Sequence, residues 1–189
     1  MSFDKFVNGK ELIASAREFA TECHKGQTRK FNGEAYINHP KSVSELVEEY
    51  GGSPEMISAA WLHDVAEDCG VKISEIKDKF GDTVAKLVDE LTLPKSVDKG
   101  GMKSDYIAKK METMSNEGLT IKLCDRLNNV SDFETAHPQF VSKYAPKTKF
   151  IMDSLEDSGR PLNTNQKKLV EHIRNMIEPY LEDLDQTKE

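Results

Sequence analysis

The stretch that decides the fold is SPEMISAAWLHDVAEDCG, residues 53–70. It begins as helices do, because Ser53 can cap the first turn and Pro54 suits the first helical position. Apolar residues then cover most of the circumference of a helix over about 54–69, which predicts a central, buried helix. Four polar residues interrupt it at spacings that would place them on one face: His63, Asp64, Glu67 and Asp68.

This polar face has two interpretations. Carboxylates that lie close together in a buried helix lose hydration and repel one another, and both effects raise the free energy. The face is therefore either exposed to solvent, as charge clusters on helices usually are, or in contact with something cationic.

Helical periodicity continues along the rest of the chain, and no segment shows the alternation of a strand. The polar, glycine-rich segment at 93–104 predicts a loop, and Asn32-Gly33 predicts a turn. After that loop, helices are expected at about 103–117, 119–132, 138–158 and 163–184. The pattern predicts an all-α fold of about 8–10 helices, packed as one domain over residues 1–189.

Composition excludes several classes of partner. The 26 basic and 33 acidic residues give a net charge of −7, which argues against binding to nucleic acid or to an anionic membrane surface. Neither a secretory signal nor an apolar stretch of transmembrane length is visible. The three scattered cysteines fit reduced thiols in a cytoplasm better than a disulfide framework. A phosphorylated small molecule remains compatible with this charge, because it responds to local groups.

A second segment, LTIKLCDRLNNVSDF at 119–133, places Asp125 and Asn129 on one side of an otherwise apolar helix. His39 stands just before a proline at another helix start. A lone histidine is usually structural, but two histidines and two aspartates from three helical segments could form a divalent metal site. Imidazole and carboxylate ligands without a thiolate favour Mn²⁺ or Fe²⁺ over structural zinc.

Three segments together resemble a known family: HKGQTRKFNGEAYINHP (24–40), AAWLHDVAEDCGVKISEIKDKFGDTVAKLVDELT (59–92) and IKLCDRLNNVSDF (121–133). They are similar to the HD-superfamily hydrolase domain of RelA/SpoT proteins, and most closely to the stand-alone, Mesh1-like small alarmone hydrolases. The similarity runs in order over about residues 10–133 and fades in the helices expected at about 138–184. That last region is too short for an alarmone-synthetase domain, so the resemblance implies hydrolysis only.

The resemblance implies hydrolysis of the 3′-pyrophosphate of guanosine tetra- or pentaphosphate with Mn²⁺, or less readily with Fe²⁺ or another divalent ion. The metal ligands it implies are His39, His63, Asp64 and Asp125. The catalytic acidic pair it implies is Glu67 and Asp68. The substrate contacts it implies are Arg29, Lys30 and Asn129. Tyr144, with lysines at helical spacing on either side, is a further candidate for the nucleotide, although such a tyrosine usually packs.

Some positions depart from the family pattern. Cys69 stands where the family usually has Thr, Ala35 where it often has Pro, and Ser131 where it often has Arg. These changes spare the expected ligands and leave base recognition open. The alternatives are a phosphohydrolase acting on pppApp, NADPH or a nucleoside monophosphate, and a non-catalytic nucleotide sensor or antitoxin. The expected partner is a small nucleotide, with no nucleic acid and no membrane, and a homo-oligomer is left open.

Overall fold

The computed structural model describes residues 8–29, 33–94, 96–97 and 103–186. These ranges are almost entirely helical, so the predicted all-α class is confirmed. The helices are α1 (Gly9–Cys23), α2 (Asn38–Glu49), α3 (Pro54–Leu62), α4 (Val65–Asp68), α5 (Ile73–Phe80), α6 (Asp82–Leu91), α7 (Lys103–Thr113), α8 (Asn116–Ser131), α9 (Pro138–Asp157) and α10 (Thr164–Gln186). Of the loop predicted at 93–104, residues 95 and 98–102 lie outside the described residues, as does Asn32 of the predicted turn.

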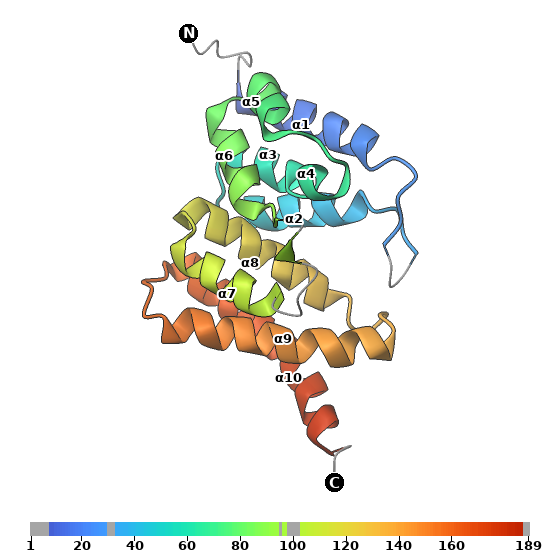
Figure 1. The fold of residues 1–189 in the computed structure, drawn as a ribbon, viewed down its shortest axis with the longest axis vertical. Coiled ribbons are helices and arrows are strands. Elements are labelled where there is room, and N and C mark those ends of the chain that lie inside the picture. The colour runs from blue at the N-terminus through green and yellow to red at the C-terminus, as the bar shows by residue number, and fades with distance from the viewer. Residues whose placement is uncertain (1–7, 30–32, 95, 98–102, 187–189) are drawn as a thin grey trace.

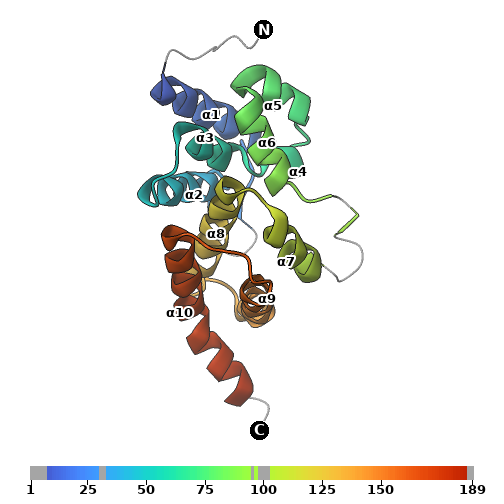
Figure 2. The same cartoon turned by 90° about the vertical axis from the view of Figure 1, so that its left-hand side faces the viewer.

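Helix α8 joins two groups of helices. Helices α1 to α6 pack together at one end of the molecule, and α7, α9 and α10 lie at the other end (Figure 1). Helix α8 packs against α2, α3 and α6 on one side and against α10 on the other, and the view in Figure 2 shows it between them. It is buried accordingly, with Leu119, Ile121, Leu123 and Val130 fully covered. The polar residues Asp125 and Arg126, in the middle of α8, are buried as well.

The capping predicted for α3 is confirmed. The Ser53 hydroxyl accepts the Met56 N–H at 3.4 Å, and Pro54 occupies the first helical position. This start fixes the register of a helix whose residues from Ile57 to Leu62 are all buried. Rigid packing of this kind holds the side chains that follow at a fixed place.

The prediction of one continuous helix over 54–69 is wrong. Helix α3 ends at Leu62, His63 and Asp64 form a turn, and α4 begins at Val65. The His63 Nδ1 donates to the Ala60 carbonyl at 2.7 Å, and this oxygen would accept the Asp64 N–H in a continuous helix. A side chain thus competes with the helix at this carbonyl. His63 and Asp64 consequently lie at a corner of the backbone rather than on one helical stripe.

The loop between α1 and α2 folds back on itself. The Arg29 N–H donates to the Glu34 carbonyl at 2.8 Å, and Thr28 and Ala35 form an isolated antiparallel bridge. Gly33 has a φ of +75°, a left-handed conformation that glycine adopts without strain. The loop returns the chain to His39 at the start of α2. None of the helices in the described ranges is long and apolar enough to span a membrane.

Candidate active site

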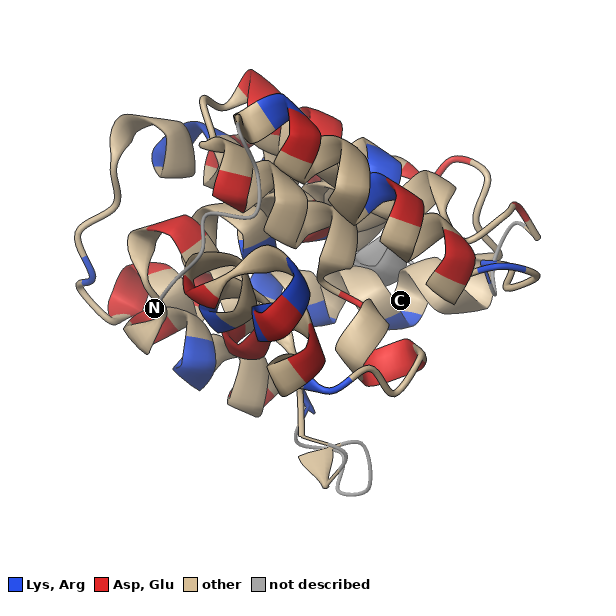
Figure 3. Cartoon of the chain, turned by 90° about the horizontal axis from the view of Figure 1, so that it is seen from above, with Lys and Arg blue, Asp and Glu red and all other residues tan. Residues whose placement is uncertain are grey.

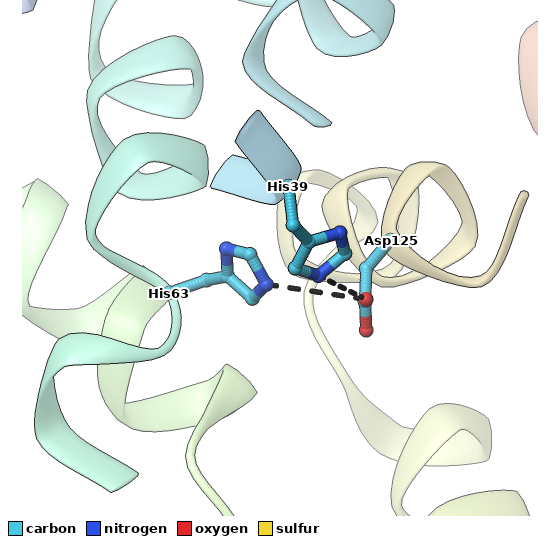
Figure 4. A group of neighbouring side chains, drawn as sticks. All are labelled: His39, His63 and Asp125. Carbon is cyan, nitrogen blue, oxygen red and sulfur yellow. Dashed lines mark ion pairs between the residues drawn. The ribbon is translucent and has the colours of Figure 1, made fainter. Parts of the chain in front are cut away.

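Three buried side chains from three elements converge on one point. His39 comes from the start of α2, His63 from the corner after α3 and Asp125 from α8 (Figure 4). Their ligand atoms all lie within 4.8 Å of one another. The Asp125 Oδ1 is 3.2 Å from the His39 Nε2 and 3.9 Å from the His63 Nε2. Residues separated by up to 86 positions in the sequence thus form one group.

Asp64 approaches the same point from the corner between α3 and α4. Its Oδ2 is 3.0 Å from the His63 Nε2 and 3.7 Å from the His39 Nε2. The Tyr36 hydroxyl donates to this oxygen at 2.7 Å and so fixes the carboxylate. All four residues expected to bind metal therefore gather in one place. Tyr36 was missed in the sequence because nothing in its spacing connects it to Asp64.

The hydrogen bonds of the two imidazoles leave one nitrogen of each pointing into the site. A carbonyl can only accept, so the bond from His63 Nδ1 to the Ala60 carbonyl places the proton on Nδ1. The His63 Nε2 is buried and has no hydrogen-bond partner among the described residues. In the neutral imidazole this nitrogen and the Asp64 oxygen are both acceptors 3.0 Å apart. Such a pair calls for a proton or a metal cation, and the donor set fits a divalent metal ion.

Without a metal, a proton takes the place of the cation. Burial alone would lower the pKa of His63, but the charge of Asp64 and its hydrogen bond outweigh burial and raise that pKa to about 9. For Asp64, burial opposes ionisation, and attraction to His63 nevertheless holds the carboxyl pKa well below its usual range. Burial acts the same way on Asp125, where Lys122, 2.8 Å away, holds the pKa far below normal. Asp64 and Asp125 both stay ionised, so a positive charge between them, from a proton or a metal ion, is favourable.

The acidic pair on α4 lies beside this group. The Glu67 Oε2 accepts the Leu93 N–H at 3.2 Å, and Oε1 is 3.8 Å from the Lys103 Nζ. Burial is the main cause of a raised pKa at Glu67, which makes its carboxylate a stronger base than an exposed one. Asp68 is exposed, and both acids line the same cavity.

Arg29, which was expected to contact the substrate, is largely buried in the protein. It is 6% exposed, and its guanidinium donates to Asn128 at 3.2 Å and to Asn129 at 3.0 Å. Its Nη2 also lies 3.0 Å from the Asp132 carboxylate. Lys30 lies outside the described residues. Asn129 in turn donates to the Asp125 Oδ1 at 2.7 Å, so a predicted substrate contact touches a predicted ligand.

A cavity of about 1000 Å³ connects these residues. On one side it reaches Asp64, Glu67 and Asp68, and on the other it is bounded by α9. The α9 side presents Phe140, Lys143, Tyr144 and Lys147. The Tyr144 ring stacks on Phe140 at 5.0 Å and lies 4.8 Å from the Arg126 guanidinium. The volume is at the upper end of ordinary ligand pockets and is large enough for a nucleotide.

Comparison with known proteins agrees with this geometry. The family model described as HD domain matches residues 16–155, which is most of the chain. The chain belongs to the HD domain family. This confirms the family expected from the ordered histidine and aspartate motifs.

Several relatives of this HD domain are named as 3′-pyrophosphohydrolases, and others, such as the one from Streptomyces coelicolor, as GTP pyrophosphokinases. The guanosine-3′,5′-bis(diphosphate) 3′-pyrophosphohydrolase MESH1 of Xenopus tropicalis is 34% identical over 131 residues, which cover 68% of this chain and 73% of the relative. The guanosine-3′,5′-bis(diphosphate) 3′-pyrophosphohydrolase of Aquifex aeolicus is 39% identical over 143 residues, which cover 75% of this chain. The chain spans only 20% of the length of such bacterial relatives.

A solved structure has the same arrangement of helices. It is described as a metazoan ortholog of SpoT that hydrolyzes ppGpp and plays a role in starvation responses. The superposition covers 87% of this chain and 94% of that one, with a TM-score of 0.75 and 25% sequence identity. The resemblance to the Mesh1-like group is therefore confirmed in sequence and in fold.

Proposed function

We propose that the protein is a metal-dependent hydrolase that converts ppGpp to GDP and pyrophosphate. The observation that carries this proposal is the convergence of His39, His63 and Asp125 beside a nucleotide-sized cavity, which His39 and Asp125 line. The names of the relatives support the same substrate. We assign His39, His63, Asp64 and Asp125 as metal ligands, and Glu67 and Asp68 as catalytic residues.

In this reaction the oxygen of a water forms a bond to the phosphorus attached to O3′, and the bond from that phosphorus to O3′ breaks. A divalent cation at the four ligands would supply Lewis-acid chemistry, which lowers the pKa of water and withdraws charge from a phosphoryl oxygen. Glu67 takes the proton of the attacking water, a role that suits its raised pKa. The exposed Asp68 holds the water beside it. The water loses one proton as it attacks, and the leaving O3′ takes up one proton, so the reaction has no net change in protons at these two oxygens.

We propose Mn²⁺ as the metal, with Fe²⁺ as the nearest alternative. The support is the chemistry of the donor set, in which two imidazole nitrogens and two carboxylates meet without a thiolate. Among the described residues, the three cysteines are free thiols, and none of them belongs to this set. We also propose a cytoplasmic protein, because three scattered cysteines without a disulfide among the described residues fit a reducing compartment.

The cavity suggests how a nucleotide with two diphosphates lies. Its 3′-diphosphate faces the metal ligands, and its other end reaches the α9 wall. Lys143 and Lys147 are one turn apart on that wall and carry no ion pair among the described residues. The stacked rings of Phe140 and Tyr144 offer an apolar surface beside them. We therefore propose that Lys143, Lys147 and Tyr144 contact the nucleotide away from the reacting bond, and that Asn129 and the Arg29–Lys30 pair contact it nearer the metal.

A panel of substrates tests this function. Purified protein with Mn²⁺ is incubated separately with ppGpp, pppGpp, pppApp, NADPH and nucleoside monophosphates, and the products are separated by chromatography. We expect pyrophosphate and GDP from ppGpp, and loss of turnover with a chelator or in Asp64→Ala. As a control, Asp153→Ala changes a half-buried aspartate on α9 that pairs with Lys149 and Arg174, and we expect it to retain activity.

Other outcomes of the panel would contradict the proposal. Turnover of NADPH or a monophosphate alone would make the protein a different phosphohydrolase on the same scaffold. Nucleotide binding without turnover under several metals would identify a sensor or an antitoxin.

A further inference from the structure

Asn128 lies in the segment DRLNN (125–129), at a position to which the family resemblance gives no role, yet it touches a predicted metal ligand. Its Oδ1 is 2.6 Å from the His39 Nδ1 and 3.2 Å from the Arg29 Nη1. We propose that Asn128 is a positioning residue that orients His39 for metal binding, and that Arg29 holds Asn128 in the required orientation. This inference rests on the proposed function only in requiring that the site binds a metal.

The bond from His39 to Asn128 crosses between two helices. His39 is the second residue of α2, and Asn128 lies near the end of α8, 89 residues later. His39 is 3% exposed, so bulk water has little access to replace a lost acceptor at its Nδ1. When the Asn128 oxygen accepts the Nδ1 proton, the neutral ring keeps a lone pair on Nε2. This nitrogen then faces the Asp125 Oδ1 at 3.2 Å and the Asp64 Oδ2 at 3.7 Å.

Arg29 decides which end of the Asn128 amide faces His39. An asparagine amide can present either its oxygen or its NH₂ group. The NH₂ group would make the His39 Nδ1 an acceptor and leave the proton on Nε2, the nitrogen that faces the metal site. A guanidinium only donates, so Arg29 requires the oxygen of Asn128 on its side. His39 and Arg29 therefore converge as donors on a single oxygen, which has two lone pairs.

The same guanidinium fixes a second ligand. Its Nη2 donates to the Asn129 Oδ1 at 3.0 Å, which turns the Asn129 Nδ2 toward Asp125. That nitrogen donates to the Asp125 Oδ1 at 2.7 Å and to the Asp125 carbonyl at 2.9 Å. The Asp132 carboxylate, 3.0 Å from the guanidinium, balances its charge. The planar Arg29 guanidinium thus orients the amides of Asn128 and Asn129. Through them it orients two of the four ligands, His39 and Asp125.

The test is metal affinity in variants of Asn128, measured without nucleotide. Metal-free protein is titrated with Mn²⁺ while electron paramagnetic resonance measures the free ion. Asn128→Leu removes the acceptor at similar size, and we expect it to weaken Mn²⁺ binding by about 10–100-fold. Asn128→Asp keeps an acceptor for both donors and should restore affinity to near the wild-type value.

A matched control separates positioning from general stability. Gln166 is a fully buried amide on α10 that donates to the Asn116 carbonyl and to Thr120, at the opposite end of α8. Gln166→Leu should lower the melting temperature and leave Mn²⁺ affinity unchanged. If Asn128→Leu does not fold, Arg29→Lys serves instead. A lysine lacks the fork that contacts both amides, and we expect weaker Mn²⁺ binding in that variant as well.

Unchanged Mn²⁺ affinity in Asn128→Leu or, where that variant does not fold, in Arg29→Lys would overturn the inference. Equal loss in Asn128→Leu and Asn128→Asp would also overturn it, because the acceptor oxygen would then not be the cause. These outcomes are distinct from failure of the proposed function. A protein that hydrolyses ppGpp with Asn128-independent metal binding contradicts the positioning role alone. Asn128-dependent metal binding together with turnover of NADPH alone contradicts the substrate alone.

Discussion

The two imidazoles of the site reach the same orientation by different means. His63 is oriented by a carbonyl three residues earlier in its own chain segment, at 2.7 Å. His39 is oriented by an amide on another helix, at 2.6 Å. The first arrangement depends on local backbone, whereas the second depends on how α2 packs against α8. Variants that loosen this packing should therefore disturb the orientation of the His39 ring more than that of the His63 ring.

Glu67 is the residue whose chemical role is easiest to separate from metal binding. Glu67→Gln keeps the shape and an oxygen that can accept the Leu93 N–H, but it cannot take a proton. We expect the variant to retain Mn²⁺ and to lose about 10²–10⁴-fold in kcat. Metal content is measured by elemental analysis and kcat by pyrophosphate release.

The control for Glu67 is Glu156→Gln, which changes an exposed glutamate on α9 that pairs with Arg174. It should leave both metal content and kcat unchanged. Loss of metal from Glu67→Gln would show that Glu67 is a ligand rather than the base.

At the scale of elements, the corner between α3 and α4 shows what the sequence could and could not reveal. Apolar periodicity and capping located the start of α3 at Pro54 correctly, and the ordered motifs brought the four expected ligands together. The break after Leu62 could not be read from periodicity, because it follows from a bond between the His63 ring and the Ala60 carbonyl. The position of Glu67 and Asp68 relative to the metal ligands therefore depends on this turn and not on the spacing within one continuous helix.

Contacts between helices, like the break after Leu62, could not be predicted from the sequence. Asn128 occupies a position to which the family pattern gives no role, and its importance appears only when α2 lies opposite α8. Arg29 was expected at the substrate as half of a basic pair. Its burial against Asn128, Asn129 and Asp132 depends on a loop that folds back between α1 and α2. Hydrogen bonds and ion pairs between residues far apart in the sequence cannot be predicted from residue spacing along the chain.

Helix α9 should act on substrate binding more than on chemistry. Lys147 faces the cavity on this helix, whereas Lys149 pairs with Asp153 at 2.6 Å on the exposed surface. We expect Lys147→Ala to raise KM for ppGpp by roughly 3–10-fold with little change in kcat, as loss of a partly exposed charge contact predicts. Steady-state kinetics at low and high salt measure this, and screening should reduce the effect at high salt.

Lys149→Ala is the matched control on α9, and its KM should equal that of the wild type. An unchanged KM in Lys147→Ala at low salt would contradict the placement of a phosphate group at the α9 wall.

At the scale of the whole molecule, the site lies where two groups of helices meet. His39, His63 and Asp64 belong to the group of α1 to α6, and Asp125 belongs to α8, which packs on both groups (Figure 2). Acidic and basic residues are interspersed over the helices seen in Figure 3, so the overall charge of −7 does not describe the local field. The acids of the cavity lie toward α4 and α8. Lys143 and Lys147, which have no ion pair in the part of the chain that the structure describes, lie on α9.

This placement predicts that metal binding stabilises the whole fold, because the ion connects elements that separate on unfolding. A ligand that binds only the folded state at 100 times its Kd adds about 2.7 kcal/mol to the free energy of unfolding. For a chain of this size that corresponds to a rise in melting temperature of about 5–10 °C. Thermal unfolding with and without saturating Mn²⁺, followed by circular dichroism, measures the shift. Asp125→Asn should lose most of the shift, whereas Asp153→Ala, which changes a half-buried aspartate on α9, should keep it. An ion that binds the wild-type protein tightly without raising its melting temperature would lie outside the junction of the two groups or would bind the unfolded chain equally well.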